Sequence, residues 1–284
     1  MKSFFGYPGG KSRLAARFEK DGFFESLFPI SSYVEPFAGG FSMGLTLLKS
    51  CGPFPVWLND IDQDVMALWR AALRHTDEFC ERVATAKVTL DTFYDIQKRI
   101  LNPQASRGTL LDRALDKLVV HKLSYSNMGE KAATPVGGKN QKNADGSKKK
   151  WKFDVRWNPQ SICGSIRRVA KTVGDCFKLD SLSVFDLLLR IPDSALVYLD
   201  PPYVGAGEKC YKHYFTEDDH ENLAKALRGA RWRWFMTYDD SELVRELYPT
   251  CQEITLNYQM SSAYRAGQAL KPNTELLITN LNQP

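Results

Sequence analysis

Short runs of β-forming residues alternate along this chain with longer amphipathic stretches. Most of the short runs end at glycine, proline or a polar residue, which is typical of a buried strand. They predict strands at 33–35, 55–58, 195–199, 232–237, 254–258 and 276–279. The amphipathic stretches predict helices at 12–19, 42–50, 63–73, 76–87, 91–101, 110–125, 161–171, 217–229 and 241–247. Strand, glycine turn and helix follow one another between residues 33 and 50, which predicts an α/β fold with a Rossmann-like sheet.

Length and composition narrow the class of protein. The 284 residues allow one large domain or two unequal ones, and 43% of them are hydrophobic. We find no apolar run long enough to span a membrane and no signal-peptide pattern. The six cysteines lie far apart, so we expect free thiols in a reducing cytoplasm and no structural zinc. The histidines show no ligand spacing, and we expect them to be surface or packing residues: His75, His121, His213 and His220.

The excess of basic residues is confined to one segment of the chain. The whole sequence has 38 basic and 33 acidic residues, a net charge of +5. Residues 139–156 hold seven basic residues and two acids, so this segment accounts for the entire excess. Aromatic rings among basic side chains suit contact with nucleic-acid bases and phosphates. A solvated lysine-rich loop explains the same pattern. The candidates for DNA contact are Lys139, Lys148, Lys149, Lys150, Trp151 and Arg156.

The tetrapeptide Asp200-Pro201-Pro202-Tyr203 follows the apolar run at 195–199. Two prolines end the strand, so the acid is expected at its carboxyl end, where open α/β sheets bind ligands. An amine on an aromatic heterocycle has its lone pair delocalised into the ring, and two acceptors for its N–H groups would localise that lone pair. Asp200 and the Pro201 carbonyl are candidates for these acceptors, Pro202 gives rigidity, and Tyr203 offers a face for stacking. Alternatively, the turn is structural and Asp200 only caps backbone groups.

A glycine turn near the N-terminus precedes Lys11. Gly9 and Gly10 would let Lys11 and the ring of Tyr7 approach a ligand closely. The alternative is an ordinary turn whose lysine faces solvent.

A second glycine turn, at 39–40, follows the strand predicted at 33–35. Its spacing is not G-x-G-x-x-G, so it does not demand a dinucleotide, but it would bring backbone close to a ligand. Asp60 ends the next predicted strand, at the place where nucleotide-binding folds have an acid for ribose hydroxyls. The alternative is that Asp60 caps the helix at 63–73.

Together these motifs resemble those of the Dam-type (class α, D12) adenine-N6 DNA methyltransferases. The similarity rests on Tyr7-Pro-Gly-Gly-Lys11, Glu35-Pro-Phe-Ala-Gly-Gly40, Asn59-Asp-Ile-Asp62 and Asp200-Pro-Pro-Tyr203, which occur in the family's order. The resemblance implies S-adenosylmethionine (SAM) as methyl donor, without a metal. It implies cofactor contacts from Tyr7, Lys11, Pro36, Phe37, Ala38, Gly39, Asp60 and Asp186. Asp186 would bond the adenine amine of SAM; the alternative is a charge at the N-terminus of a helix at 187–190.

The resemblance also implies a division of the chain. Residues 1–72 and 164–284 would form the catalytic domain, and 73–163 a mainly helical insertion that recognises DNA. The substrate would be double-stranded DNA with the adenine flipped out of the helix, and the enzyme would be a cytoplasmic protein of a bacterium or phage. The insertion lacks an Asn-Arg-x-x-x-Asn-Gly pattern, so the target sequence is not implied. The alternatives are cytosine N4 in DNA, adenine N6 in RNA, or a DNA-binding module without catalysis.

Overall fold

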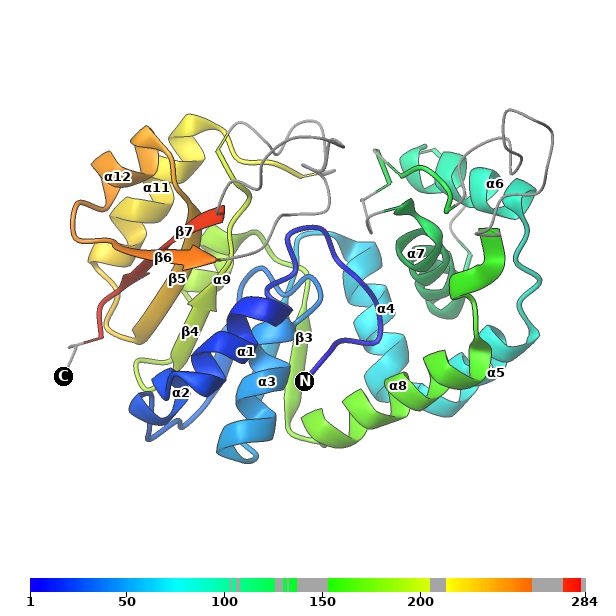
Figure 1. The fold of residues 1–284 in the computed structure, drawn as a ribbon, viewed down its shortest axis with the longest axis horizontal. Coiled ribbons are helices and arrows are strands. Elements are labelled where there is room, and N and C mark those ends of the chain that lie inside the picture. The colour runs from blue at the N-terminus through cyan, green and yellow to red at the C-terminus, as the bar shows by residue number, and fades with distance from the viewer. Residues whose placement is uncertain are drawn as a thin grey trace.

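The computed structural model describes residues 1–102, 104–105, 108–125, 130–131, 133–136, 153–204, 213–256 and 273–281. At the centre of these residues lies a seven-stranded sheet with the order β3-β2-β1-β4-β5-β7-β6 (Figure 1). The strands are β1 (Tyr33–Glu35), β2 (Val56–Asn59), β3 (Phe177–Asp180), β4 (Leu196–Leu199), β5 (Arg233–Asp239), β6 (Gln252–Leu256) and β7 (Asn273–Thr279). The first five in this order pair in parallel, and β7 runs antiparallel between β5 and β6. The predicted Rossmann-like α/β fold is confirmed.

Helices cover both faces of the sheet. They are α1 (Ser12–Lys20), α2 (Phe23–Ser26), α3 (Ser42–Cys51), α4 (Gln63–Arg74), α9 (Val184–Leu188), α11 (Glu217–Arg228) and α12 (Glu242–Leu247). Successive residues of a strand point to opposite faces. Tyr33 and Tyr198 therefore pack into the core formed with α1, α3 and α4. Val34 and Val197 pack into the core formed with α9, α11 and α12.

The direction of strand addition reverses between β1 and β4. The chain places β2 and β3 on one side of β1, and β4 and β5 on the other. β1 and β4 are parallel neighbours, with Val34 opposite Val197. Loops that leave two such strands diverge and open a crevice outside their carboxyl ends. Asp200 follows β4 and the glycine turn at 39–40 follows β1, so both reach this crevice.

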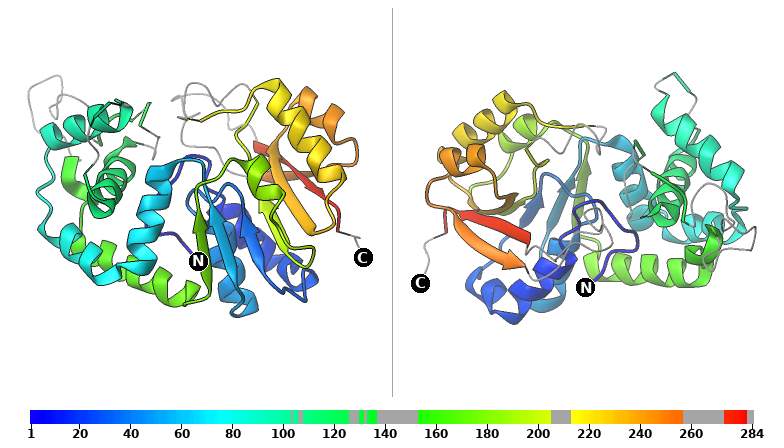
Figure 2. Two further views of the ribbon diagram at one scale, coloured as in Figure 1. Left: turned by 180° about the vertical axis from the view of Figure 1, so that it is seen from behind. Right: turned by 45° about the horizontal axis from the view of Figure 1, so that its top comes forward.

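A helical lobe lies beside the sheet (Figure 1, Figure 2). It contains α5 (Thr76–Thr85), α6 (Leu90–Leu101), α7 (Leu110–Leu123), the short 3-10 helix η2 (Phe153–Arg156) and α8 (Pro159–Val173). The lobe has a small core of its own, to which Phe93, Val120 and Phe153 contribute. α7 packs against α4, and α8 packs against α3 and α5, which joins the lobe to the sheet. The lobe is mainly helical, and the division of the chain at 73 and 163 remains a prediction. α8 crosses residue 163.

The elements that the hydrophobic pattern misses include β3 and α2. β3 lies at the edge of the sheet, and its residues include Lys178 and Asp180 with only Leu179 buried. An edge strand of this kind has no apolar run to mark it. α2 is a single turn, too short to show helical periodicity.

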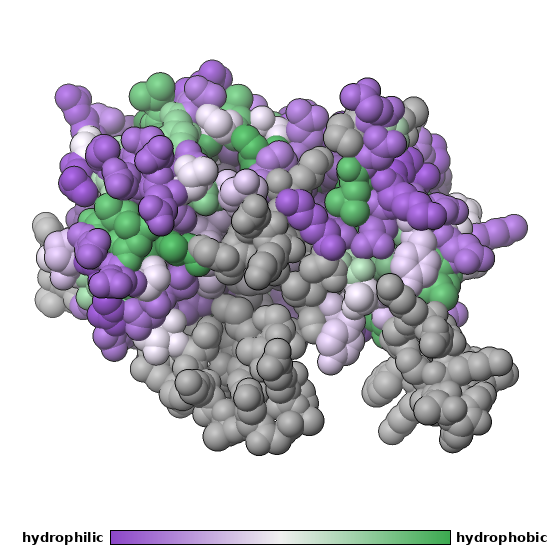
Figure 3. Space-filling model, turned by 90° about the horizontal axis from the view of Figure 1, so that it is seen from above, coloured by the Kyte–Doolittle hydropathy of each residue, from purple (hydrophilic) through white to green (hydrophobic). Residues whose placement is uncertain are grey.

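The surface is mostly hydrophilic on the described part of the face seen in Figure 3, where hydrophobic side chains form separate patches. Within the described ranges, no helix is long and apolar enough to cross a membrane. Five of the six candidates for DNA contact lie outside the described residues: Lys139, Lys148, Lys149, Lys150 and Trp151.

Candidate active site

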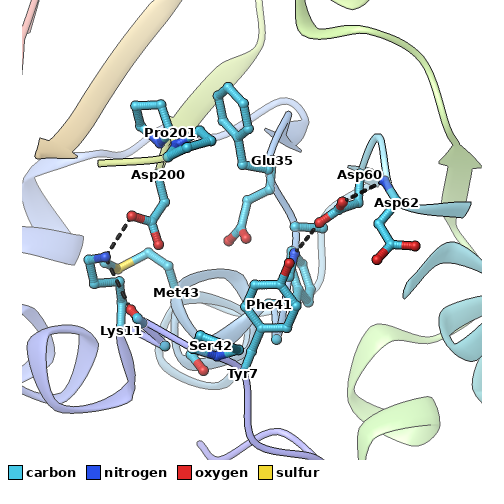
Figure 4. Close-up of a pocket in the computed structure, with 18 of the residues that line it drawn as sticks. Tyr7, Lys11, Glu35, Phe41, Ser42, Met43, Asp60, Asp62, Asp200 and Pro201 are labelled. Carbon is cyan, nitrogen blue, oxygen red and sulfur yellow. Dashed lines mark hydrogen bonds and ion pairs between the residues drawn. The ribbon is translucent and has the colours of Figure 1, made fainter. Parts of the chain in front are cut away.

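A cavity opens at the carboxyl ends of β1, β2 and β4. Including the open solvent at its mouth, the empty space of this cavity is about 960 Å³. The turns after β1, β2 and β4, the N-terminal segment and α7 all contribute to its wall. Figure 4 shows Lys11 and Asp200 on one side of the cavity, and Asp60 and Asp62 on the other. The fold therefore brings most of the predicted site residues together.

Asp200 forms an ion pair with Lys11. The Lys11 ammonium donates to Asp200 Oδ1 over 2.6 Å and to the Gly9 carbonyl over 3.1 Å. Lys11 is only 4% exposed, so the alternative of a lysine in solvent is excluded. Burial raises the pKa of Asp200, and the Lys11 ammonium opposes that rise. Burial would lower the pKa of Lys11, but Asp200 and its other neighbours raise it well above its usual value, so the lysine stays charged.

Glu275 of β7 completes this end of the site, and the sequence analysis did not select it. Tyr203 donates its hydroxyl proton to Glu275 Oε1 over 2.9 Å. Glu275 Oε2 lies 4.0 Å from the Lys11 ammonium and has no hydrogen-bond partner within the described part of the chain. The ammonium also lies 4.9 Å from the centre of the Tyr203 ring. One sequence signal could have identified Glu275: it is the single charged residue of its strand, Asn273–Thr279.

The glycine turn after β1 requires glycine at Gly39. Its φ of +43° is left-handed, and a Cβ there would lie 2.8 Å from the Tyr7 ring. Tyr7 thus packs against the turn. Its ring also stacks on the ring of His121, with the two ring centroids 5.4 Å apart. The indole N–H of Trp69 donates to the Gly39 carbonyl and so helps to hold the turn in place.

Asp60 holds the same turn in place. Its carboxylate accepts the backbone N–H of Gly39 over 2.9 Å and that of Asp62 over 2.9 Å. The alternative that Asp60 caps the next helix is not what the structure shows, because Asp62 is the N-cap residue of α4 and accepts from Asp64 N. Burial, with the Asp62 charge as a further cause, raises the pKa of Asp60 to about 6. The two bonds leave lone pairs on both oxygens for further donors.

Glu35 is a buried acid in the wall of the cavity. Its Oε1 accepts the Tyr33 hydroxyl over 2.7 Å and the Gly44 N–H over 2.8 Å. Burial raises the pKa of Glu35 to about 8, so the carboxyl is mostly protonated at neutral pH. It belongs to the end of β1 and anchors the start of α3.

Of the predicted site residues that the structure describes, Asp186, Pro36 and Arg156 do not line the cavity. The exposed Asp186 accepts the hydroxyl proton of Ser183 and lies within the first turn of α9, as the helix-end alternative expects. The Pro36 carbonyl accepts from the side chain of Asn59. Arg156 donates to the Ser124 carbonyl over 3.3 Å, inside the helical lobe.

α7 contributes a polar stripe that the sequence analysis missed. Arg113, Lys117 and His121 recur every four residues and so share one face of the helix. Arg113 bonds Asp64 over 2.9 Å, and Lys117 bonds Asp62 over 2.7 Å. His121 and Lys117 both line the cavity. The expectation that His121 is merely a surface or packing residue is therefore incomplete, since its ring forms part of the cavity wall.

A Rossmann-like sheet with an acid and two prolines at the end of β4 defines a class of enzymes, the methyltransferases that act on the exocyclic amine of a base. Comparison with known proteins specifies the family. The sequence model of the D12 class N6 adenine-specific DNA methyltransferases matches residues 7–262, and the chain belongs to this family.

The chain is also similar to the Type II methyltransferase M.MjaIII of Methanocaldococcus jannaschii, with 23% identity over 250 residues that cover 80% of each chain. The family match confirms the predicted resemblance and the enzyme class. The protein is a methyltransferase of adenine N6 in DNA, and membership of this family implies use of SAM. Cytosine N4, RNA adenine and a non-catalytic DNA-binding role are not favoured.

Proposed function

We propose that the protein transfers the methyl group of SAM to adenine N6 after the adenine has flipped out of double-stranded DNA. The observation that carries this proposal is the Asp200–Lys11 pair at the end of β4, in the cavity that also contains the turn after β1. The amine inside a duplex is out of reach of such a cavity, so the base must leave the stack, at a cost of a few kcal/mol.

The chain's own residues fit SAM. We propose that Tyr7, Lys11 and the turn at 36–39, which includes Phe37 and Ala38, contact the cofactor, and that Asp60 accepts from its ribose hydroxyls. In support, Asp60 is fixed by two backbone N–H groups but keeps free lone pairs. Asp186 remains a proposed partner of the adenine amine, with its bond to Ser183 as the competing explanation. We propose no metal.

When bound, SAM supplies an electrophilic methyl group on its sulfonium. The protein's task is to position and activate the amine. Asp200 Oδ2 and the Pro201 carbonyl would accept the two N–H groups and leave the nitrogen lone pair free. Pro202 keeps this turn rigid, and Tyr203, anchored by Glu275, offers its ring to the base. Orientation of the amine toward the methyl group, with desolvation on binding, would supply most of the rate acceleration.

We propose that the insertion at 73–163 contacts the DNA and that 1–72 and 164–284 form the catalytic domain. Lys139, Lys148, Lys149, Lys150, Trp151 and Arg156 are the proposed contacts, supported by the concentration of basic charge in this segment. The name of the archaeal relative supports a further proposal, that the enzyme protects DNA in a restriction–modification system.

The test is to incubate plasmid DNA with the protein and SAM, digest it, and identify the nucleosides by mass spectrometry. We expect N6-methyladenine from the wild type and none from Asp200→Ala. N4-methylcytosine instead, or methylation of RNA alone, would overturn the proposal. Comparing single-stranded with double-stranded DNA tests the duplex requirement.

A further inference from the structure

We propose that His121 and Glu130 form a site for the α-ammonium group of the methyl donor, so that the helical insertion itself binds part of the cofactor. This assignment rests on the proposed use of SAM and deepens it. His121 lies on α7 and is 1% exposed, and Glu130 is 5% exposed; both line the cavity.

The hydrogen bond to Gly6 fixes the state of the His121 ring. Nδ1 lies 3.0 Å from the Gly6 carbonyl oxygen. A carbonyl can only accept, so Nδ1 carries the proton. Burial lowers the pKa of His121 to about 4, which keeps the ring neutral and leaves a lone pair on Nε2. Nε2 is therefore a hydrogen-bond acceptor.

This acceptor has no donor within the described part of the chain. Nε2 is buried without a hydrogen-bond partner there. The group that approaches it is the Glu130 carboxylate, whose Oε1 lies 3.8 Å away and is itself an acceptor. Glu130 Oε1 already accepts from Lys117, whereas a buried Nε2 without a donor costs free energy, which a donor placed beside both groups would recover. One nitrogen with several N–H groups can satisfy both at ordinary bond lengths of about 2.8 Å.

The charge at this end of the cavity favours a cation. Around Lys117, the described lining residues with acidic side chains are Asp60, Asp62 and Glu130. Lys11, the other lysine of the lining, is paired with Asp200 on the opposite side of the cavity (Figure 4). Lys117 already bonds both Asp62 and Glu130. Its pKa, which burial would lower, is raised by these two carboxylates, so it is one fixed positive charge against three acids. Glu130 Oε1 already accepts from Lys117, so the missing donor is the one for His121 Nε2. A primary ammonium supplies that donor and adds a positive charge that offsets the excess.

Stacking on Tyr7 holds the His121 ring in place. The centroids of the two rings lie 5.4 Å apart, and the angle between the ring planes is 13°. Tyr7 in turn lies against the Gly39 turn, so His121 is oriented relative to the part of the cavity proposed to hold SAM. The bond to Gly6 fixes which nitrogen faces the cavity.

The test compares two ligands in binding calorimetry: S-adenosylhomocysteine, and its desamino analogue, which keeps the carboxylate but lacks the ammonium. We expect the wild type to prefer the amino ligand by about tenfold or more, as for a hydrogen bond to a charged group. Equal affinities would overturn the inference while leaving SAM use intact. Absence of binding by SAM and by both ligands would instead refute the proposed function.

Variants then locate the ammonium. His121→Phe keeps the ring that stacks on Tyr7 but removes the acceptor, so the preference should fall severalfold while affinity for the desamino ligand stays within about twofold. His121→Gln retains an acceptor oxygen and should keep part of the preference, and Glu130→Gln should also reduce it. An equal loss for both ligands, or no loss, would show that His121 only supports the fold.

The matched control is His220→Phe. His220 is also buried and bonds the Tyr238 hydroxyl, but it does not line the cavity. Its replacement should leave the ratio of the two affinities unchanged. A changed ratio in this variant would contradict the assignment of the ammonium site to His121.

Discussion

The Lys11 ammonium and Asp200 Oδ1 lie 2.6 Å apart, although 189 residues separate them in the sequence. The pair joins the N-terminal glycine turn to the turn after β4, so each motif completes the other. It also leaves Asp200 with one oxygen engaged and the other available to the target amine. Asp200 Oδ2 is the oxygen proposed to accept from the target amine, so removal of the carboxylate should affect catalysis.

Replacement of Asp200 should separate catalysis from cofactor binding. Asp200→Ala removes an acceptor of the target amine, so turnover should fall by at least about a hundredfold, the usual effect of losing one such electrostatic contact. Asp200→Asn keeps an acceptor oxygen and should retain part of the activity. SAM affinity measured by calorimetry should change little in either variant. Full turnover by Asp200→Ala would refute the mechanism.

Glu275→Gln tests the acid that faces Lys11. The amide still accepts from Tyr203, but the negative charge beside the Lys11 ammonium is lost. Because Glu275 helps to raise the pKa of Lys11, its removal lowers that pKa. The alkaline limb of the pH–rate profile should therefore move to lower pH. Tyr203→Phe is the complementary variant, because it loses the hydrogen bond to Glu275 but keeps the charge. Identical profiles for the two variants would argue against a role for the charge.

SAM binding should weaken in acid through Asp60. Its pKa is raised to about 6, so the carboxylate form, which accepts from ribose, is lost as the pH falls through this value. In Asp60→Asn the affinity at pH 7.5 should drop by about 1–3 kcal/mol and its pH dependence between about 5 and 8 should flatten. Calorimetry across this range checks both. Unaltered affinity in the variant would restrict Asp60 to supporting the turn at Gly39.

Glu35 should make the wild type less stable as the pH rises. The folded pKa is about 8 and the ordinary value 4.5, so within this window the native state holds a proton that the unfolded chain has released. The free energy of unfolding therefore falls as the pH increases from about 5 to 8, by at most about 1.4 kcal/mol per unit. Glu35→Gln removes this contribution. Urea denaturation of both proteins at several pH values checks this. The difference between their free energies of unfolding should change steadily with pH, and parallel plots of these free energies against pH would contradict the prediction.

The basic segment is tested by salt. If Lys148, Lys149 and Lys150 each neutralise a phosphate, changing all three to alanine should flatten the log–log slope of DNA affinity against salt by up to about 2.7. Affinity should fall similarly for cognate and random duplexes, because phosphate contacts do not read sequence. SAM affinity should be unchanged. Superimposable slopes for the two proteins would mean that these lysines remain in solvent.

The sequence by itself determined the strands, the turns and the reacting tetrapeptide, because these depend on local rules. The apolar run at 195–199, followed by Asp-Pro-Pro, predicts a buried strand that ends there, and the structure has the buried strand β4 at Leu196–Leu199. The hydrophobic pattern did not predict β3, because an edge strand needs no apolar run.

Only the tertiary structure decided which side chains meet. The partnership of Lys11 with Asp200 depends on the sheet order, which places β1 beside β4. Glu275 reaches Tyr203 because β7 pairs with β5 near the same edge. Spacing alone could not decide whether Asp60 or Asp62 caps α4, since either could accept the first free N–H groups of this helix. His121 joins the cavity because α7 packs on α4, and no local pattern records such a contact between distant helices.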